Sequence, residues 1–542
     1  MTGFRVVFGL WLLFCAAMSS AAASSWQDEP EARLQLHQQG LELALADVHP
    51  MLTLWWQQAV SVDSASDEAD DRLLLGMQAF WRYWASLSFV DRQYLSTTDV
   101  PLLFQEQDKS ELLLAAEQRR RHVLVQKLAP GYASHEQLQQ QLARLLALNV
   151  EPWPALRTAT VRPGERVAVV PHIRERLRLL GDMPAETGAS LSVVSDDTGA
   201  PYDTDDSDTV SPIDNAAVLD SSRVVDGVVV SDDRVSLDGI RSAFVDVSPI
   251  HDPEVYDADL ERVVRDFQQR HGLQVDGVIG PQTFAWLDVA PLRRAQLLMR
   301  SMLRTLIGDK LPSSYLLVNI PEYRLRLYQD QVVVLDSDVI VGKGQRRTPI
   351  MSSKITNVVL NPPWNVPRSI IERDIVPRLY REPDYIEREG FEVLDGAGLV
   401  PRAEWQARLY NGGGFPYRLR QKPGARNALG AYKFHLPNDD AIYLHDTPGR
   451  SLFSRDSRAL SSGCVRVEGA EQLANWLLSG QMSPERLAAL KGSGVTRWLR
   501  VAQPLPVFMV YWPGWLGSDG LPRFRNDIYD FDRALSSPFT SG

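Results

Sequence analysis

The chain has 542 residues, of which 44% are hydrophobic and 23% are charged, so it can bury several hydrophobic cores. Its formal net charge of −11 argues against a nucleic acid as its partner, because surfaces that bind nucleic acids are basic. Its two cysteines, Cys15 and Cys464, are the only sulfur nucleophiles it carries.

The first 23 residues have the layout of a cleavable signal peptide. Arg5 precedes an apolar run at 6–17, and three alanines at 21–23 provide an A-x-A-type cleavage site. The apolar run is short for a transmembrane span. We therefore expect a soluble periplasmic protein exported by a cleavable signal peptide. The alternative is an inner-membrane anchor formed by an uncleaved N-terminus.

Residues 24–160 are predicted to form a helical scaffold domain without chemistry of its own. The region is rich in Leu, Gln, Ala, Glu and Arg, and within 135–148 the side chains of Leu138, Leu142 and Leu145 fall on one helical face.

Residues 161–290 are predicted to form a second, small helical domain, interrupted by an acidic insertion at about 183–253. After the insertion, Leu260, Val263 and Phe267 have helical spacing, and Asp-Gly and Gly-Pro steps at 276–281 make turns. The segment 267–283 resembles the small peptidoglycan-binding domain, which implies binding to cell-wall glycan or peptide. Residues 291–312 are predicted to be a linker helix.

From residue 313 the pattern changes to strands, with Leu316, Val318 and Ile320 in alternation. We expect a β-rich domain over 313–503, interrupted by an Arg- and Glu-rich, mixed helical stretch at about 368–422. A closing strand and a polar C-terminal tail are expected over 504–542.

The residues that can carry chemistry lie between 443 and 467. A predicted strand ends at His445, and alternation places Tyr443 on the same face as His445. Gly463 permits a positive φ that can aim the next side chain, Cys464, into a cleft. A histidine beside a cysteine can take its proton and create the reactive thiolate. Backbone N–H groups near Gly463 and Cys464, with the Tyr443 hydroxyl, are candidate oxyanion donors.

The orientation of the imidazole needs another group. Strand alternation directs Asp446 away from His445, so we expect a backbone carbonyl or a hydroxyl to orient the ring.

A nucleophilic Cys464 has two alternatives. A free cysteine can be a small buried hydrophobic residue. A zinc site made of Cys464, His445 and His435 lacks CxxC or HExxH spacing. We therefore expect no metal and no cofactor.

His445 followed by Ser461-x-Gly463-Cys464-x-Arg466 resembles the signature of the L,D-transpeptidases, cysteine enzymes that cross-link peptidoglycan. Asp446-Thr447-Pro448 after the histidine is similar to the large periplasmic members. The resemblance implies a multidomain α+β protein whose stretch at 368–422 is a capping subdomain over the active site.

The resemblance also implies roles for individual residues. Cys464 and His445 would be catalytic, and Tyr443 and Gly463 would stabilise the oxyanion or orient groups. The implied substrate-binding residues are Arg466, Ser461, Ser462 and Trp364.

The implied activity is formation of diaminopimelate–diaminopimelate cross-links through a cysteine thioester. The implied partners are peptidoglycan stem peptides and also other cell-wall synthesis proteins. Cys464 would be a carbapenem target. An L,D-carboxypeptidase, an amidase that releases wall-linked proteins, and a non-catalytic wall-binding scaffold remain as alternatives.

Overall fold

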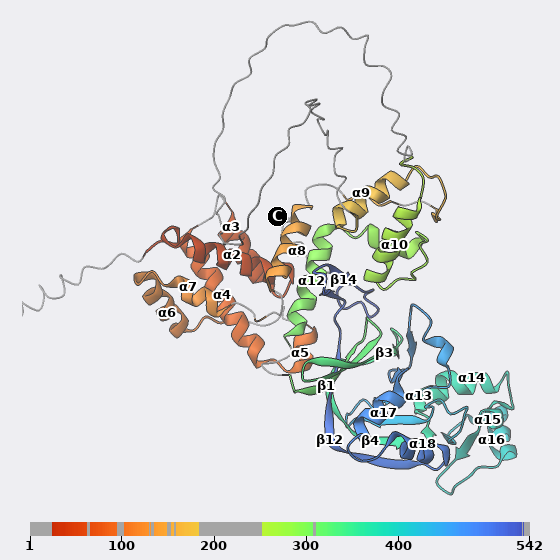
Figure 1. Cartoon of the computed structure of the whole chain (residues 1–542). Helices are drawn as coiled ribbons and strands as arrows, with labels where there is room; N and C mark the ends of the chain where they lie inside the picture. The colour runs from red at the N-terminus through yellow and green to blue at the C-terminus, as the bar shows by residue number, and fades with distance from the viewer. Residues whose placement is uncertain are drawn as a thin grey trace, which may run out of the picture.

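The computed structural model describes residues 24–61, 66–94, 102–128, 131, 135–148, 153–156, 159–183, 252–306, 311–533 and 535. The predicted signal peptide and almost all of the predicted acidic insertion lie outside these residues. A helical region, a small helical module and a β-rich domain follow one another along the chain, which confirms the predicted α+β class (Figure 1). None of the helices in the described ranges is long and apolar enough to cross a membrane.

The N-terminal region is helical, as predicted. Ser66 caps its longest helix by accepting a hydrogen bond from the N–H of Ala69, and acidic side chains in the first turn suit the positive end of the helix dipole. Trp26, Leu36 and Phe80 are fully buried in its core. Its helices are α2 Pro30–Leu45, α3 Pro50–Val60, α4 Asp67–Ser86, α5 Phe89–Tyr94, α6 Glu106–Glu117, α7 Arg121–Lys127 and α8 His135–Ala147.

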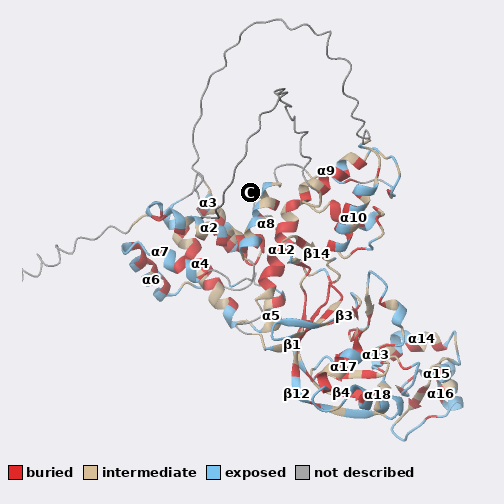
Figure 2. Cartoon of the chain, viewed as in Figure 1, coloured by how far each residue is buried: buried red, intermediate tan, exposed pale blue. Residues whose placement is uncertain are grey.

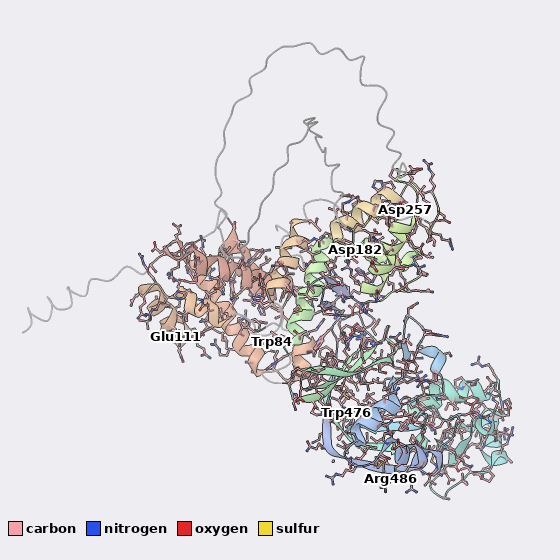
Figure 3. All side chains as sticks on the ribbon, viewed as in Figure 1. Trp84, Glu111, Asp182, Asp257, Trp476 and Arg486 are labelled. Carbon is pink, nitrogen blue, oxygen red and sulfur yellow. The ribbon has the colours of Figure 1, made fainter. Side chains whose placement is uncertain are left out.

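The small module contains α9 (Val170–Leu180), α10 (Ala258–Arg270) and α11 (Pro281–Leu287). Figure 3 shows Asp182 just after α9 and Asp257 at the start of α10. The buried Gln268 of α10 accepts a hydrogen bond from the N–H of Gly277 at 2.9 Å and donates to the carbonyl of Val278 at 3.0 Å. This side chain thereby fixes the turn that leads into α11.

Helix α12 (Pro291–Thr305) is a central core helix, although the sequence predicted a linker helix at 291–312. It packs against α2 and α8, and its residues share one hydrophobic cluster with the N-terminal helices and the small module. Figure 2 shows most of it as buried. The arginines Arg294, Arg300 and Arg304 are buried as well, so the face that carries them is covered.

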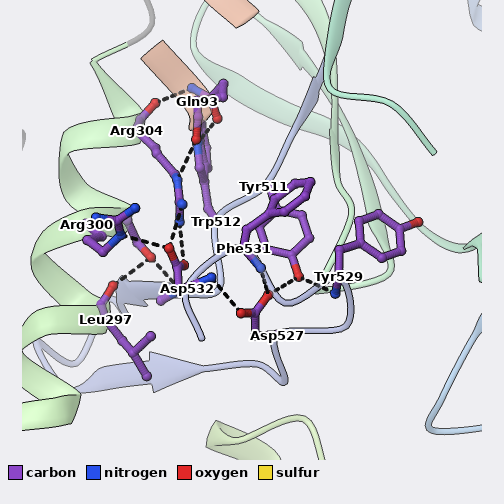
Figure 4. Close-up of polar contacts among 12 residues, drawn as sticks. Gln93, Leu297, Arg300, Arg304, Tyr511, Trp512, Asp527, Tyr529, Phe531 and Asp532 are labelled. Atoms are coloured by element: carbon purple, nitrogen blue, oxygen red, sulfur yellow. Dashed lines mark hydrogen bonds and ion pairs between the residues drawn. The ribbon is translucent and has the colours of Figure 1, made fainter. Parts of the chain in front are cut away.

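The C-terminal segment covers part of that face. After a hairpin of β13 (Gly514–Leu516) and β14 (Pro522–Phe524), the chain returns to α12. The buried carboxylate of Asp532 accepts hydrogen bonds from Arg304 at 2.6 and 2.7 Å and from Arg300 at 2.8 Å (Figure 4). The segment predicted as a polar tail is therefore an integral part of the fold as far as Asp532.

The β-rich domain is built on a nine-stranded sheet in the order β10-β3-β11-β9-β8-β4-β12-β1-β2. The first half of β3 pairs with β2 and its other end pairs with β11 and β10, so the sheet closes on itself. The strands are β1 Ser314–Asn319, β2 Arg324–Gln329, β3 Val332–Gly342, β4 Met351–Leu360, β8 Tyr432–His435, β9 Leu444–His445, β10 Ala459–Ser461, β11 Val465–Val467 and β12 Arg497–Val510.

Strand β12 lies in the middle of this sheet, between β4 and β1. The boundary expected between 503 and 504 falls inside it, so the closing strand belongs to the β-rich domain. Helix α17 (Ala470–Leu478) packs on the domain's core through buried Leu473 and Ala474.

A cap is inserted between β4 and β8. It has its own hydrophobic cluster, which includes Trp405, Phe415 and Tyr417. Its elements are β5 Trp364–Asn365, α13 Arg368–Ile370, the π-helical turn η2 Ile371–Ile375, α14 Val376–Leu379, α15 Tyr385–Arg388, β6 Phe391–Leu394, α16 Arg402–Arg408, the π-helical turn η3 Leu409–Gly413 and β7 Arg418–Gln421.

Candidate active site

The pairing of β9 with β11 brings the two predicted catalytic residues to one face of the sheet. The strands are parallel, with Leu444 opposite Val465 and His445 opposite Arg466. Leu444 and Val465 are fully buried on the core side. Because side chains alternate along a strand, the neighbouring Cys464, His445 and Arg466 lie on the other face.

The loop before Cys464 is held by Ser461. Its hydroxyl donates to the carbonyl of Cys464 at 2.6 Å and accepts from the N–H of Gly463 at 3.1 Å. Gly463 has φ +117°, in the region that favours glycine, as predicted. Thr348 also supports the loop, because its hydroxyl donates to the carbonyl of Gly463 at 2.7 Å.

This arrangement bears on two of the predicted roles. The N–H of Gly463 is engaged by Ser461, so it is not free to stabilise an oxyanion. No acceptor among the described residues contacts the N–H of Cys464. Ser461 lines the cleft, but its hydroxyl is hydrogen-bonded within the loop and not directed at the cleft as a substrate-binding group.

The imidazole of His445 is oriented by a backbone carbonyl, as the sequence predicted. Its Nδ1 lies 2.6 Å from the carbonyl oxygen of Asp446. A carbonyl can only accept, so Nδ1 carries the proton and Nε2 is left as the basic nitrogen. The carboxylate of Asp446 instead accepts from the N–H of Ala431 at 2.9 Å.

Tyr443 is the polar neighbour of the sulfur. Interactions with its backbone and its hydroxyl lower the pKa of the Cys464 thiol against the larger effect of burial. Sγ of Cys464 lies 3.9 Å from the carbonyl oxygen of Ala441, and Trp364 lines the same cleft as Tyr443 and Cys464. The Tyr443 and His445 rings lie 5.6 Å apart between centroids. The cap therefore reaches the catalytic face through Trp364, which belongs to β5.

Both candidate catalytic groups are held in their neutral forms. Burial raises the pKa of the Cys464 thiol, and Tyr443, Lys433 and Arg466 offset this only in part. Burial, together with the charges of Arg466 and Lys433, lowers the pKa of His445 to about 3, although the hydrogen bond to the Asp446 carbonyl opposes this shift. The resting pair is therefore a thiol and a neutral imidazole.

Two cations flank His445. Lys433 of β8 is its antiparallel register partner, and the Lys433 ammonium lies 3.9 Å from the centre of the Tyr443 ring. Arg466 is its partner on the other side, and the buried Nε of Arg466 has no hydrogen-bond acceptor among the described residues. Neither cation has a carboxylate partner among the described residues, so both favour negative charge on Cys464, and Arg466 lines the cleft itself.

The cleft itself has a volume of about 430 Å³. A bidentate ion pair between Arg346 and Asp374 joins the loop after β3 to the cap, and Arg346 also donates to the hydroxyl of Ser462 at 2.9 Å. The residues that line the cleft include Lys343, Arg346, Trp364, Asp374, Tyr443, His445, Ser461, Ser462, Cys464 and Arg466.

The sequence-predicted site residues thus come together, with Gly463 in the loop behind them. The sequence did not indicate Lys433, Arg346 or Asp374 as site residues. Lys433 alternates with buried Tyr432 and Phe434, which is typical of a strand with one face on the core, but only the pairing of β8 with β9 sets it opposite His445. In the described ranges, no three His, Cys, Asp or Glu side chains are close enough to hold a metal ion.

Comparisons with known proteins fit this geometry. Residues 313–488 match the family model of the L,D-transpeptidase catalytic domain, and residues 246–287 match the model described as "Putative peptidoglycan binding domain". The chain therefore contains an L,D-transpeptidase catalytic domain and a peptidoglycan-binding domain. A Haemophilus influenzae protein named "Putative L,D-transpeptidase" is 44% identical over 223 residues. That match covers 40% of this chain and 45% of the relative, so the chain spans less than half the length of this curated relative.

Solved structures give weaker likenesses. An L,D-transpeptidase from Xylanimonas cellulosilytica is 13% identical, with 66% of this chain and 100% of that chain covered and a TM-score of 0.18. L,D-transpeptidase 3 from Mycobacterium tuberculosis, in complex with a faropenem-derived adduct, is 11% identical, with 37% and 60% covered and a TM-score of 0.19. Likenesses of this size say nothing further about the chain.

Proposed function

We propose that this chain is an L,D-transpeptidase that cross-links peptidoglycan stem peptides through a thioester on Cys464. The observation that carries the proposal is the parallel register of β9 and β11, which sets Cys464 beside Tyr443 and His445 at one cleft. The matching catalytic domain at 313–488 supports it.

Acylation starts when Sγ of Cys464 attacks the carbonyl carbon of the third residue, diaminopimelate, in a tetrapeptide stem. Because burial favours the neutral thiol and imidazole, the proton passes to Nε2 of His445 as the carbon–sulfur bond forms. The amide carbon–nitrogen bond then breaks, the leaving nitrogen takes that proton, and D-alanine departs.

The oxygen of the attacked carbonyl needs donors while it carries negative charge. We assign this role to the N–H of Cys464, which contacts no acceptor among the described residues, and to the hydroxyl of Tyr443. Preorganised donors of this kind stabilise the tetrahedral intermediate. Trp364 lines the same cleft as Tyr443.

The second half of the reaction forms the cross-link. The side-chain amine of a second stem attacks the thioester, His445 accepts its proton, and the carbon–sulfur bond breaks as the amide forms. The thiol regains a proton and the enzyme is restored. Arg466, which has no ion-pair partner among the described residues, binds a carboxylate of the stem.

The proposal is tested with purified residues 24–542 and a Cys464→Ala variant, each incubated with a carbapenem. A single stoichiometric adduct on the parent alone, seen by intact-protein mass, is the expected result. Dimeric muropeptides made from tetrapeptide stems by the parent would then establish cross-linking. Release of tripeptides alone indicates a carboxypeptidase, and release of a wall-linked protein indicates an amidase. An adduct on both proteins or on neither contradicts Cys464 as the nucleophile.

The reaction requires a location outside the cytoplasmic membrane, where peptidoglycan lies. We propose export through the segment 1–23. Mass analysis of the mature protein from the periplasm should show an N-terminus at Ser24. Retention of the full N-terminus in the membrane fraction would instead indicate an anchor.

A further inference from the structure

A second cleft lies between the small module and the β-rich domain. Its volume is about 350 Å³, and it adjoins a smaller cavity of about 190 Å³. Gly272 from the module, Tyr323 and Asp456 from the β-rich domain, and Arg525 from the C-terminal segment line both. No role in the proposed reaction uses this cleft.

The walls of this interdomain cleft are fixed to each other. Nη1 of Arg525 donates to the carbonyl of Arg270 at 2.9 Å, at the end of α10. The indole of Trp286 donates to the side chain of Asn526 at 2.8 Å. The guanidinium of Arg525 also lies over the Trp515 ring, 4.8 Å from its centre. The cleft is therefore preformed, and a ligand would pay little ordering cost.

Most charges around the cleft are already paired. The pairs are Arg324–Asp336, Arg324–Asp338, Arg326–Glu322 and Arg458–Asp338.

Two charges in the cleft remain. Arg525 and Asp456 have no ion-pair partner among the described residues. The hydrogen bonds of Arg525 use only Nη1, which leaves the Nε–Nη2 edge for a bidentate carboxylate. Asp456 is exposed and can accept from an ammonium group. A guanidinium and a carboxylate without ion-pair partners in the same cleft suit a ligand that carries both a negative and a positive charge.

The interdomain cleft is also close to Cys464. Asp456 and Arg458 line it just before β10, and Ser461, at the far end of β10, lines the catalytic cleft. Asp456 precedes Ser461 by five residues, which span at most roughly 17 Å. An extended tetrapeptide spans roughly 13 Å, so two stems carried by one polymer, one in each cleft, can occupy both sites.

We propose that the interdomain cleft binds a zwitterionic peptide, with its carboxylate on Arg525 and its ammonium on Asp456. Resting on the proposed function, this peptide is a neighbouring, unreacting stem of the same peptidoglycan strand. The site would hold the polymer while another stem reacts at Cys464.

The test uses protein whose Cys464 has been alkylated with iodoacetamide, so that the catalytic cleft is blocked. The probe is the soluble tetrapeptide L-Ala-γ-D-Glu-diaminopimelyl-D-Ala, and binding is measured by calorimetry. We expect one remaining site whose affinity falls with added salt, because both contacts are ionic. Asp456→Asn should weaken it at least about threefold.

Matched variants make the result decisive. Asp259→Asn changes an exposed aspartate at the other end of α10 and should bind like the parent. Arg525→Gln should weaken binding as well, and Asp456→Asn keeps the test valid if loss of Arg525 disturbs folding. No binding to the blocked parent, or equal binding by Asp456→Asn and the parent, would overturn the inference.

Failure of this inference and failure of the proposed function give different results. If the unblocked parent does not turn over the tetrapeptide, the proposed function is wrong, whatever the blocked protein binds. If the parent is active and Asp456→Asn cross-links intact sacculi as fast as the parent does, the second site is wrong. The expected pattern is unchanged turnover of free tetrapeptide and slower cross-linking of sacculi by Asp456→Asn.

Discussion

Lys433 lies directly opposite His445 in the antiparallel register of β8 and β9, and its ammonium is 3.9 Å from the centre of the Tyr443 ring. Arg466 is opposite His445 on the other side. The imidazole thus sits between two cations, in a buried position where a third positive charge is costly. This placement explains why the histidine is neutral and available as a base.

The pH dependence of Cys464 reactivity follows from that arrangement. The thiol pKa is raised by burial, so the fraction of thiolate grows only in the alkaline range. The pKa of His445, lowered to about 3, puts no titration near pH 6.5. Iodoacetamide alkylation of the folded protein should therefore show a single ascending limb that is still rising at about pH 9. A plateau of high reactivity at pH 6–7 would instead reveal a preformed thiolate–imidazolium pair.

Lys433→Met should slow the reaction of Cys464 with a carbapenem at neutral pH by about tenfold, because one positive charge near the developing thiolate is lost. The ascending limb of the alkylation profile should also move to higher pH. Lys433→Arg keeps the charge and should restore most of the rate. A rate loss in both variants without any change in the pH profile would mean that Lys433 is needed only for packing.

Tyr443→Phe removes a hydroxyl that contacts Cys464 and keeps the ring. Loss of one oxyanion donor lowers kcat by about 10² in well-studied enzymes, and we expect a similar loss for thioester formation from a tetrapeptide. Trp364→Phe is a useful comparison, because it keeps an aromatic ring in the cleft wall and removes the indole N–H. It should have a smaller effect, and equal losses would argue against a direct role for the hydroxyl.

The sequence predicted the part of the site that is local in the chain. Strand alternation placed Tyr443 and His445 on one face, and the residue before Cys464 had to be a glycine to reach φ +117°. The sequence could not show that the Ser461 hydroxyl bonds within the loop, because the direction of a hydroxyl depends on how the loop closes. In the structure that hydroxyl accepts a hydrogen bond from the N–H of Gly463, so this N–H is not free to act as the predicted oxyanion donor.

Features that depend on distant pairing were missed. Lys433 acquires its place from the register of β8 with β9, and Asp374 from the docking of the cap. The segment 291–312 was predicted to be a linker helix, because the buried partner of its arginines, Asp532, comes 228 residues after Arg304. Long-range partners of this kind leave no periodic signal in the sequence.

Asp532→Asn should destabilise the folded protein, because it leaves two buried arginines without a counter-charge. Burial alone would raise the pKa of Asp532, but Arg304 and Arg300 outweigh it and hold the pKa at about 2. Breaking such a buried pair costs about 3 kcal/mol, measurable by denaturant unfolding. The folded pKa lies below the usual carboxyl value of about 3.9. This contribution is therefore complete above that pH and is lost as the pH falls toward 2.

Asp530→Asn is the control for that measurement. Asp530 is exposed and lies 3.9 Å from exposed Arg533, so its substitution should change the stability by less than about 0.5 kcal/mol. Similar losses in both variants would mean that the Asp532 pairs do not hold the C-terminal segment to α12.

Asp374→Asn should open the cap over the catalytic cleft. Asp374 accepts a bidentate pair from Arg346, which in turn donates to Ser462 beside the catalytic loop, so the pair ties the cap to the rim of the site. Because the pair is partly exposed, its loss costs about 1 kcal/mol, and carbapenem acylation of Cys464 should accelerate by up to about fivefold. Added salt should also accelerate carbapenem acylation of the parent and leave the rate of the variant nearly unchanged.

Glu372→Gln is the control, because it breaks a pair with Arg368 that lies wholly inside the cap, and it should not alter the acylation rate. Equal acylation rates for the parent and Asp374→Asn at low salt would show that this ion pair does not limit access to Cys464.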